Sequence, residues 1–498
     1  MNSFRNLGRL VFPAVLMSLL LGGCGGSSSS PEALQPQDPG VGQVALLFTD
    51  LPSEDFDQIL IRFDEVSLLG DEGHQVIYPQ SDDDGEMEID LLSMRQVSDV
   101  AFIREVPAGM YSKVRLHLTG IDLVKEGEPT VEVTLVANGK LDLNPRGEFE
   151  VRGGQMLFIE LDIDANRSFQ AHQSGNGRWH FRPVVFMDIF GDYDLHRLMR
   201  VFGEVTAVDS TAMTFDLCPV GMISQMGAGM GMSAEHSQCI TVFPGDSGVF
   251  SPEDGTDVGF GALEVTEPAQ QLTMIGYFRS TLGMEVDAMS EFDAVVVELG
   301  DVTAFARLGG MALGGPADYD IEPGTPVFDW AVRSGQSLPE GTVVTAQLQD
   351  KTRIFDSEGN EFVDELVGSS AIQQGVTGMV DGIDDAGLFR SSLVVLDALN
   401  TGDEQLSGTV ASPILSEDMQ SFALTTDVTI ETICVASDAQ ILKLESVDDG
   451  SGAVVTLSPS AFDEIEIDQT VEVTGAASET AGCTFDARIV IIDLIPVT

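Results

Sequence analysis

The stretch Lys113-Val114-Arg115-Leu116-His117-Leu118 alternates basic and aliphatic side chains. Successive side chains of a β-strand point to opposite faces, so this pattern predicts a strand with one buried face. The alternation returns in Val131-Glu132-Val133-Thr134-Leu135, and Asn138-Gly139 then marks a hairpin turn before the next strand. From Val41 onward, short alternating stretches are separated by Gly, Asp, Asn and Pro turns. The sequence therefore predicts an all-β chain whose first domain is an antiparallel sandwich.

Six motifs in and around this stretch carry a family resemblance. In chain order they are Leu47-Phe48-Thr49-Asp50-Leu51-Pro52, Phe63-Asp64-Glu65-Val66, Ile89-Asp90-Leu91-Leu92, Val106-Pro107-Ala108-Gly109-Met110-Tyr111 with Arg115-Leu116, Leu161-Asp162-Ile163-Asp164, and Arg182-Pro183-Val184. Together they resemble domain-of-unknown-function family 4382 over about residues 42–190. The resemblance implies an exported sandwich of the immunoglobulin or transthyretin type, often found on lipoproteins. It implies a fold for residues 42–192 and no catalytic residue.

Residues 1–23 have the parts of a secretory signal peptide: two arginines, an apolar run from Leu10 to Leu21, and two glycines. The run is too short for a membrane-spanning helix and contains Pro13. Leu21-Gly22-Gly23-Cys24 resembles the lipobox of bacterial lipoproteins, whose cysteine receives several acyl chains and so binds a bilayer stably. The alternative is an ordinary signal peptide with an unrelated cysteine.

Residues 24–41, rich in Gly, Ser, Pro and Gln, are typical of a flexible tether. No aspartate follows Cys24, which resembles lipoproteins sorted to the outer membrane. We therefore expect the chain to be attached to the bacterial outer membrane through a lipid anchor at Cys24.

The charge of the chain excludes one class of partner. Residues 1–23 hold two Arg and no acid, which leaves 22 basic and 80 acidic residues and a net charge near −58. Such a chain repels polyanions, so nucleic-acid binding is excluded. High salt or bound divalent cations relieve the self-repulsion. A marine or halophilic host is the simpler explanation of this charge, and calcium binding is the more specific one.

Four cysteines remain after Cys24, namely Cys218, Cys239, Cys434 and Cys483. An even number in an exported protein predicts disulfides, although four cysteines allow three pairings. We expect Cys218–Cys239 and Cys434–Cys483, because each pair lies within one proposed domain. Four unrelated buried thiols are the alternative.

The chain after residue 197 is predicted to hold three small β-barrel or sandwich modules, at 197–300, 301–400 and 401–498. Their similar stretches are Val201–Val205, Met213–Leu217 and Phe292–Val296 in the first, Gly375–Val380 and Leu388–Ser391 in the second, and Leu406–Val410, Phe422–Leu424, Asp468–Gly475 and Phe485–Ile489 in the third. They resemble the small barrels of domain-of-unknown-function family 5666. Such repetition indicates reach, multivalency or a scaffold.

Two motifs suggest catalysis or calcium but lack required residues. Gly245-Asp246-Ser247-Gly248 matches the nucleophile loop of trypsin-like proteases, but Val249 replaces a glycine and no partner histidine segment lies upstream, so a turn is the better interpretation. Asp162-Ile163-Asp164-Ala165-Asn166 begins like a calcium loop, but Arg167 and Gln173 stand where glycine and glutamate belong. Alternation instead places Leu161 and Ile163 on one strand face and the two aspartates on the other.

Two further segments are candidate metal sites. Asp82-Asp83-Asp84-Gly85-Glu86 suits a weak divalent-cation site, and a solvated acidic turn is its alternative. Met222, Met226, Met230 and Met232 with His236 lie between Cys218 and Cys239, and thioether sulfurs select Cu(I). A glycine-rich hairpin tip without metal is the alternative there.

The remaining motif search finds no enzyme signature. His172, His180 and His196 lack zinc spacing, and the sequence has no phosphate-binding loop, dinucleotide motif or G-x-S-x-G elbow. We expect no enzyme and no required cofactor. The leading prediction is a non-enzymatic envelope lipoprotein that binds or scaffolds an envelope protein or polysaccharide. The alternative is a metal-binding accessory lipoprotein, with calcium on acidic turns or copper on the methionine loop.

Overall fold

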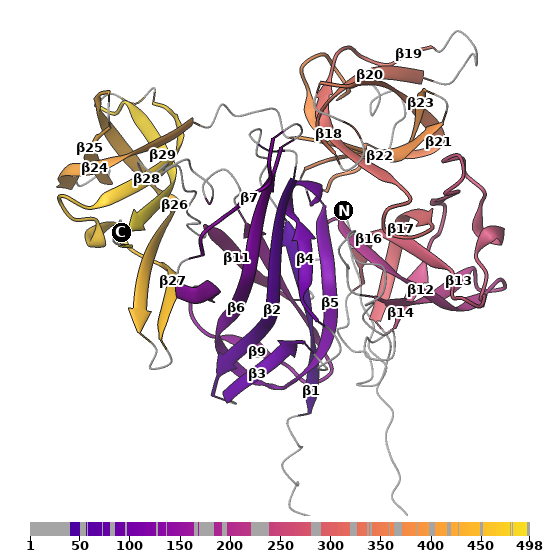
Figure 1. Cartoon of the computed structure of the whole chain (residues 1–498), viewed down its shortest axis with the longest axis horizontal. Helices are drawn as coiled ribbons and strands as arrows, with labels where there is room; N and C mark the ends of the chain where they lie inside the picture. Colours follow the sequence, from indigo (N-terminus) through magenta and orange to yellow (C-terminus); the bar gives the residue numbers. More distant parts are fainter. Residues whose placement is uncertain are drawn as a thin grey trace, which may run out of the picture. The chain divides into compact units, whose positions relative to one another are not determined.

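The computed structural model describes residues 40–495 except 50–55, 57, 72, 80–84, 95–96, 126–127, 136, 164–167, 169–183, 192–196, 221–238, 280–289, 319–325, 336–337, 339–340, 358, 363–370, 386, 398–403, 416–419, 427, 449–451, 479 and 481. The described residues belong to one compact unit, Pro39–Thr498. Every element with described bounds is a β-strand or a three-residue 3-10 helix (Figure 1). The prediction of an all-β chain is confirmed. Within the described part of the chain, no helix has the length and apolar character needed to span a membrane.

The first domain is a sandwich of two sheet regions. Its strands are β1 (Val41–Thr49), β2 (Gln58–Gly70), β3 (Gly73–Tyr78), β4 (Met87–Asp90), β5 (Ser98–Pro107), β6 (Gly109–Val124), β7 (Val131–Glu132), β8 (Lys140–Leu143), β9 (Phe149–Val151), β10 (Met156–Ile163) and β11 (Val185–Phe190). One region has the order β11-β10-β1-β5, and the other has β8-β6-β2-β3 with β4, β7 and β9 attached. The expectation of a purely antiparallel sandwich is wrong for the first region, where β1 and β10 pair in parallel. Aliphatic and aromatic side chains from both regions, including Phe48 of β1 and Phe63 of β2, pack in one core.

The alternation at 113–118 has the expected consequence. Val114, Leu116 and Leu118 of β6 are buried, and the three basic residues between them are half-buried. The prediction that the strands on either side of Asn138-Gly139 form a hairpin is wrong. The turn leads into β8, but β7 and β8 both pair with β6 and not with each other. The long strand β6 offers enough edge for both short strands.

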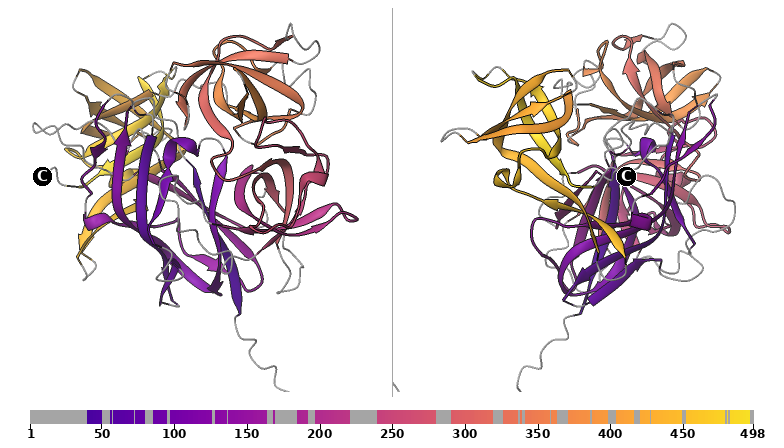
Figure 2. Two further views of the ribbon diagram at one scale, coloured as in Figure 1. Left: turned by 45° about the vertical axis from the view of Figure 1, so that its right-hand side comes forward. Right: turned by 60° about the vertical axis from the view of Figure 1, so that its left-hand side comes forward.

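Three further sets of strands follow, and the one between 306 and 396 is visible as a curled group in Figure 2. The first set is β12 (Met199–Asp209), β13 (Thr214–Pro219), β14 (Ile240–Phe243), β15 (Gly248–Phe250), β16 (Gln271–Phe278) and β17 (Ser290–Leu299). The second set is β18 (Ala306–Ala312), β19 (Ala317–Asp318), β20 (Pro326–Gly335), β21 (Val343–Asp356), β22 (Thr377–Asp385) and β23 (Leu388–Leu396). The third set is β24 (Glu404–Leu415), β25 (Gln420–Thr425), β26 (Ile430–Asp448), β27 (Ala453–Pro459), β28 (Thr470–Ala477) and β29 (Phe485–Asp493).

The three sets are copies of one closed barrel. In the second, β18 pairs with β20 and β22, β23 pairs with β22 and in parallel with β21, and β20–β21 closes the ring. The strands β12, β13, β14, β16 and β17 pair in the same way, and so do β24, β25, β26, β28 and β29. Such a ring is a five-stranded Greek-key barrel, the architecture of OB-folds. The repeated β module expected from the sequence is therefore present.

A glycine recurs at one place in each barrel, on the fourth strand, where its register against the fifth strand shifts. A Cβ there would lie 2.0, 2.2 and 1.9 Å from a carbonyl oxygen of the fifth strand. The three residues are Gly276, Gly382 and Gly475. Because only glycine permits so close an approach of two backbones, these positions bend the strands that close each ring.

Strand pairing joins the first domain to two of the barrels. Strand β5 pairs in parallel with β12 through Ser98 and Asp99, and β8 pairs in parallel with β27 at Leu141–Leu143. The ten-stranded and thirteen-stranded sheets therefore cross the boundaries proposed near residues 192 and 401. The first domain consequently contacts the first and third barrels through backbone hydrogen bonds as well as side chains.

Candidate functional site

One concave feature of the described residues is a cleft of about 630 Å³ between the first domain and the third barrel. One wall is β11 with Glu160 and Asp162 of β10, and a second is the segment from Leu143 to Phe149. The third wall is formed by Gln440, Leu442, Leu457, Pro459 and Ile489 of the third barrel. The volume of this cleft lies within the range of small-molecule and cofactor sites.

The cleft forms at the open side of the sandwich. Strand β11 is the last strand of its sheet, and among the described residues it pairs with β10 alone. Five successive residues of this strand, 185–189, line the cleft. In the opposite sheet β8 pairs with β27, so residues of the third barrel form the far wall of the cleft. An edge strand therefore forms one wall of the cleft.

An arginine holds the acidic groups on this edge. Arg197 donates from Nη1 to Glu160 Oε1 and from Nη2 to Asp188 Oδ2, both at 2.5 Å. Its guanidinium also lies over the ring of Phe190, 5.0 Å from the centroid. Burial lowers the pKa of Arg197, but the two carboxylates outweigh that effect and the pKa is raised. The arginine thus stays charged and fixes both carboxylates at the wall.

Asn144, at the end of β8, connects two walls of the cleft. Its backbone N–H donates to Leu457 O of the third barrel at 3.1 Å. Its side-chain Oδ1 is buried and has no hydrogen-bond partner, so it does not face a ligand in the cleft.

A second cluster of charged groups lies in the interior and joins three parts of the chain. Arg200 of β12 donates to Asp99 of β5 at 2.9 Å and to Asp381 of β22 at 2.5 Å. Arg307 of β18 also donates to Asp99, at 3.4 Å. Each of these side chains is at most 4% exposed. The cluster connects the first domain, the first barrel and the second barrel.

Glu298 of β17 completes this cluster and carries the most informative pKa. Burial raises the pKa of Glu298 to about 7, and repulsion from Asp381 adds to the effect, while the hydroxyl of Ser392 and the two arginines oppose it. Ser392 donates its hydroxyl hydrogen to Glu298. With Glu298 protonated, two arginines face two aspartates and the cluster is neutral. None of these residues lines the cleft, so the cluster holds the parts of the chain together and offers no access to a ligand.

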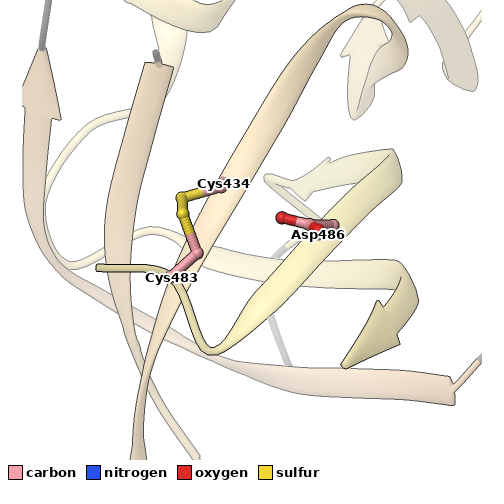
Figure 3. Close-up of side chains that lie close together, drawn as sticks. All are labelled: Cys434, Cys483 and Asp486. Atoms are coloured by element: carbon pink, nitrogen blue, oxygen red, sulfur yellow. A yellow bond between two sulfur atoms is a disulfide. The ribbon is translucent and has the colours of Figure 1, made fainter. Parts of the chain in front are cut away.

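The four cysteines form the two disulfides expected from the sequence, Cys218–Cys239 and Cys434–Cys483. Asp486 lies beside the second of them (Figure 3). Three such side chains could hold a metal ion if the thiols were free, but here the two sulfurs are bonded to each other. Asp486 accepts a hydrogen bond from Ser478 Oγ at 2.7 Å. The group is thus a cross-link with a satisfied carboxylate.

The protease-like motif is a turn, as expected. Ser247 donates its backbone N–H to Pro244 O at 2.8 Å, and its hydroxyl donates to the same carbonyl. Asp246 pairs with Lys351 at 2.6 Å. Leu161 and Ile163 of the calcium-like motif are buried, whereas Asp162 is half-buried on the other face of β10.

Several predicted residues lie outside the described part of the chain. These are Cys24, Asp82–Asp84, Asp164–Arg167 and Gln173, the histidines at 172, 180 and 196, and Met222, Met226, Met230, Met232 and His236. Of the acidic turn, Gly85 is described, and its carbonyl accepts a hydrogen bond from Tyr78 Oη at 2.9 Å. The lipid anchor and both metal sites remain predictions.

The sequence reasoning missed the cleft and the buried cluster. Charged residues inside apolar strand stretches were the available signal, as in Leu198-Met199-Arg200-Val201 and Ile159-Glu160-Leu161. A charge in such a place indicates a buried partner, but its identity depends on strand pairing far along the chain.

No curated protein matches this chain. The model of one family, described as a domain of unknown function (DUF4382), matches residues 41–183, which confirms the family resemblance of the first domain and extends over less than a third of the chain.

Proposed function

We propose that this chain is an envelope-anchored, non-enzymatic binding lipoprotein whose ligand occupies the cleft between the first domain and the third barrel. In this proposal Cys24 carries the acyl chains, palmitate among them, that attach it to the outer membrane. Residues 24–41 tether the folded part, and the repeated barrels resembling family 5666 extend and brace it.

The cleft is the observation that carries the proposal. It is lined by apolar side chains from two sheets and by polar and charged groups, of which Arg197, Glu160 and Asp188 hold one another in place. The described residues that line it include no serine, cysteine, histidine, lysine or tyrosine. Two of the four carboxylates in the lining, those of Glu160 and Asp188, are held by Arg197. This lining supports binding, since the described residues place no hydroxyl, thiol, imidazole or primary amine in the cleft to act as a nucleophile.

The binding test narrows the cleft without disturbing the core. Gln440 is exposed on β26 and lines the cleft, so Gln440→Trp should fill the mouth and leave folding intact. Gln420 is exposed on β25 of the same barrel outside the cleft, and Gln420→Trp is the matched control. The full chain would be immobilised and offered soluble peptidoglycan fragments, envelope polysaccharide and a digest of envelope proteins.

We expect wild type and Gln420→Trp to retain the same component and Gln440→Trp to retain at least tenfold less. Equal retention by all three proteins, or by none, would exclude the cleft as a binding site.

The proposed lipid anchor at Cys24 is tested separately. Cells should incorporate labelled palmitate into the wild-type chain, and Cys24→Ser should release the chain from membranes. A Cys24→Ser chain that stays labelled and membrane-bound would reject the lipid anchor.

A further inference from the structure

Strand β11 has the features of a docking edge for another strand. It pairs on one side with β10, and in the described part of the chain its other side has no strand partner. Unpaired edges are templates for strand addition, and proteins usually cover or blunt them. This one is instead part of the cleft wall over residues 185–189.

We propose that the cleft binds an extended polypeptide segment that adds to β11 as a further strand and carries alternating apolar and basic side chains. This inference rests on the proposed binding function and names the chemistry of its ligand. Five residues of β11 span roughly 13 Å, so about five residues of the segment would pair with them.

The register of β10 and β11 gives the expected pattern of the segment. Val185, Met187 and Ile189 lie opposite Ile163, Leu161 and Ile159, which are all buried. Phe186 and Asp188 lie opposite Asp162 and Glu160. Side chains alternate between the two faces of a sheet, so an added strand would present every second residue to the apolar face and the others to the acidic face.

The charge of the cleft favours basic rather than acidic side chains on the bound segment. The cleft is lined by four acids, Glu148, Glu160, Asp162 and Asp188, and by two bases, Arg146 and Arg197. The whole chain carries a formal net charge of −56, which attracts cations and repels anions over longer distances. A second copy of β11 is a poor occupant, because its own Asp188 would face these acids.

The decisive probe is a set of labelled seven-residue peptides, measured by fluorescence anisotropy with the full chain in detergent. The parent alternates Lys and Val, and a second peptide has Glu in place of Lys. Two more carry N-methyl groups on all valines or on all lysines. Backbone N–H groups of alternate residues point to opposite edges of a strand, so strand addition is blocked by one methylation pattern and tolerates the other.

We expect saturable binding of the parent, at least tenfold weaker binding of the glutamate peptide, and at least tenfold weaker binding of one methylated peptide only. Asp188→Lys should weaken binding of the parent peptide at least fivefold. The control Asp463→Lys makes the same charge change at an exposed position of the third barrel outside the cleft, and should leave binding within twofold.

Three outcomes would overturn the inference: equal effects of both methylations, equal effects of the two charge reversals, or no saturable signal up to about 1 mM parent peptide. The outcome for strand addition can be distinguished from the outcome for the proposed binding function. If Gln440→Trp abolishes retention of an envelope component but no peptide binds in this way, strand addition is wrong and the cleft remains a binding site, for example for a glycan.

Discussion

Arg200 and Asp381 lie 181 positions apart in the sequence, and they form an ion pair of 2.5 Å in which both side chains are fully buried. Arg200 is also the register partner of Asp99 across the parallel contact of β12 with β5. One guanidinium therefore links the first domain to two barrels. Burial lowers the pKa of Arg200, but Asp381 and Asp99 outweigh it, so the pKa is raised and the arginine is charged at any working pH.

Arg200→Met should lower the free energy of unfolding by about 3–5 kcal/mol, because it leaves two buried aspartates without their main cation. Denaturant unfolding followed by circular dichroism measures the loss. Arg152→Met is the control, since Arg152 pairs with Glu150 at the surface with side chains 58% and 49% exposed. It should change stability by less than about 1 kcal/mol. Adding Asp381→Asn to Arg200→Met should restore part of the loss, because Asp99 still pairs with Arg307, and a further loss would contradict this account.

Glu298 should make the stability depend on pH in a direction opposite to that of most carboxylates. Its pKa in the folded chain is about 7, above the ordinary 4.5. Between these values the folded state keeps the proton and the unfolded state releases it, so stability falls as pH rises from 4.5 to 7. The loss is at most about 1.4 kcal/mol per pH unit, and it is complete above the folded pKa.

Glu298→Gln removes this dependence, because the amide stays neutral and can still accept a hydrogen bond from Ser392. The unfolding temperatures of wild type and Glu298→Gln, measured from about pH 5 to 8, should therefore diverge in favour of the variant as pH rises. Parallel curves would show that Glu298 does not titrate in this range.

The recurring barrel glycine should be intolerant of any side chain. Gly475→Ala would place its Cβ 1.9 Å from Asp486 O, so strands β28 and β29 would have to separate. We expect a loss of about 1–3 kcal/mol in the free energy of unfolding, with a similar loss for Gly382→Ala. Gly261→Ala is the control, since a Cβ there meets no atom within 4 Å and the backbone is not left-handed. A neutral Gly475→Ala would mean that the barrel closes without this contact.

The two disulfides should differ in their contribution to stability. They close loops with sequence separations of 21 and 49 residues. In the chain-entropy description the shorter loop contributes about 3.3 kcal/mol and the longer about 4.1 kcal/mol. Replacing Cys434 and Cys483 by Ala should therefore destabilise the chain more than replacing Cys218 and Cys239. Unfolding of the two double variants tests the order, and the reverse order would point to strain or residual structure rather than loop entropy.

Local pattern was sufficient to predict the strands, because alternation such as that of Val114, Leu116 and Leu118 depends only on which face is buried. It also predicted repeated modules through their glycine-containing strand pairs. The pairing of β7 and β8 with β6 could not be predicted, since the partner of a short strand depends on which strand edges lie next to it in the folded chain. The cleft could not be predicted for the same reason. Asp188 and Glu160 acquire their roles only because β11 ends a sheet next to the third barrel.

The excess of acid should make the chain more stable in salt without a specific need for calcium. Eighty acidic residues against 24 basic ones repel one another, and added salt shortens the range of that repulsion to about 3 Å at 1 M. We expect the unfolding temperature to rise between about 0.05 and 1 M NaCl and to be unchanged by EDTA at constant ionic strength. Millimolar CaCl₂ compared with MgCl₂ at equal ionic strength is the control for the acidic turn at Asp82–Glu86. A rise with calcium alone, reversed by EDTA, would establish a structural calcium site and favour the metal-binding alternative.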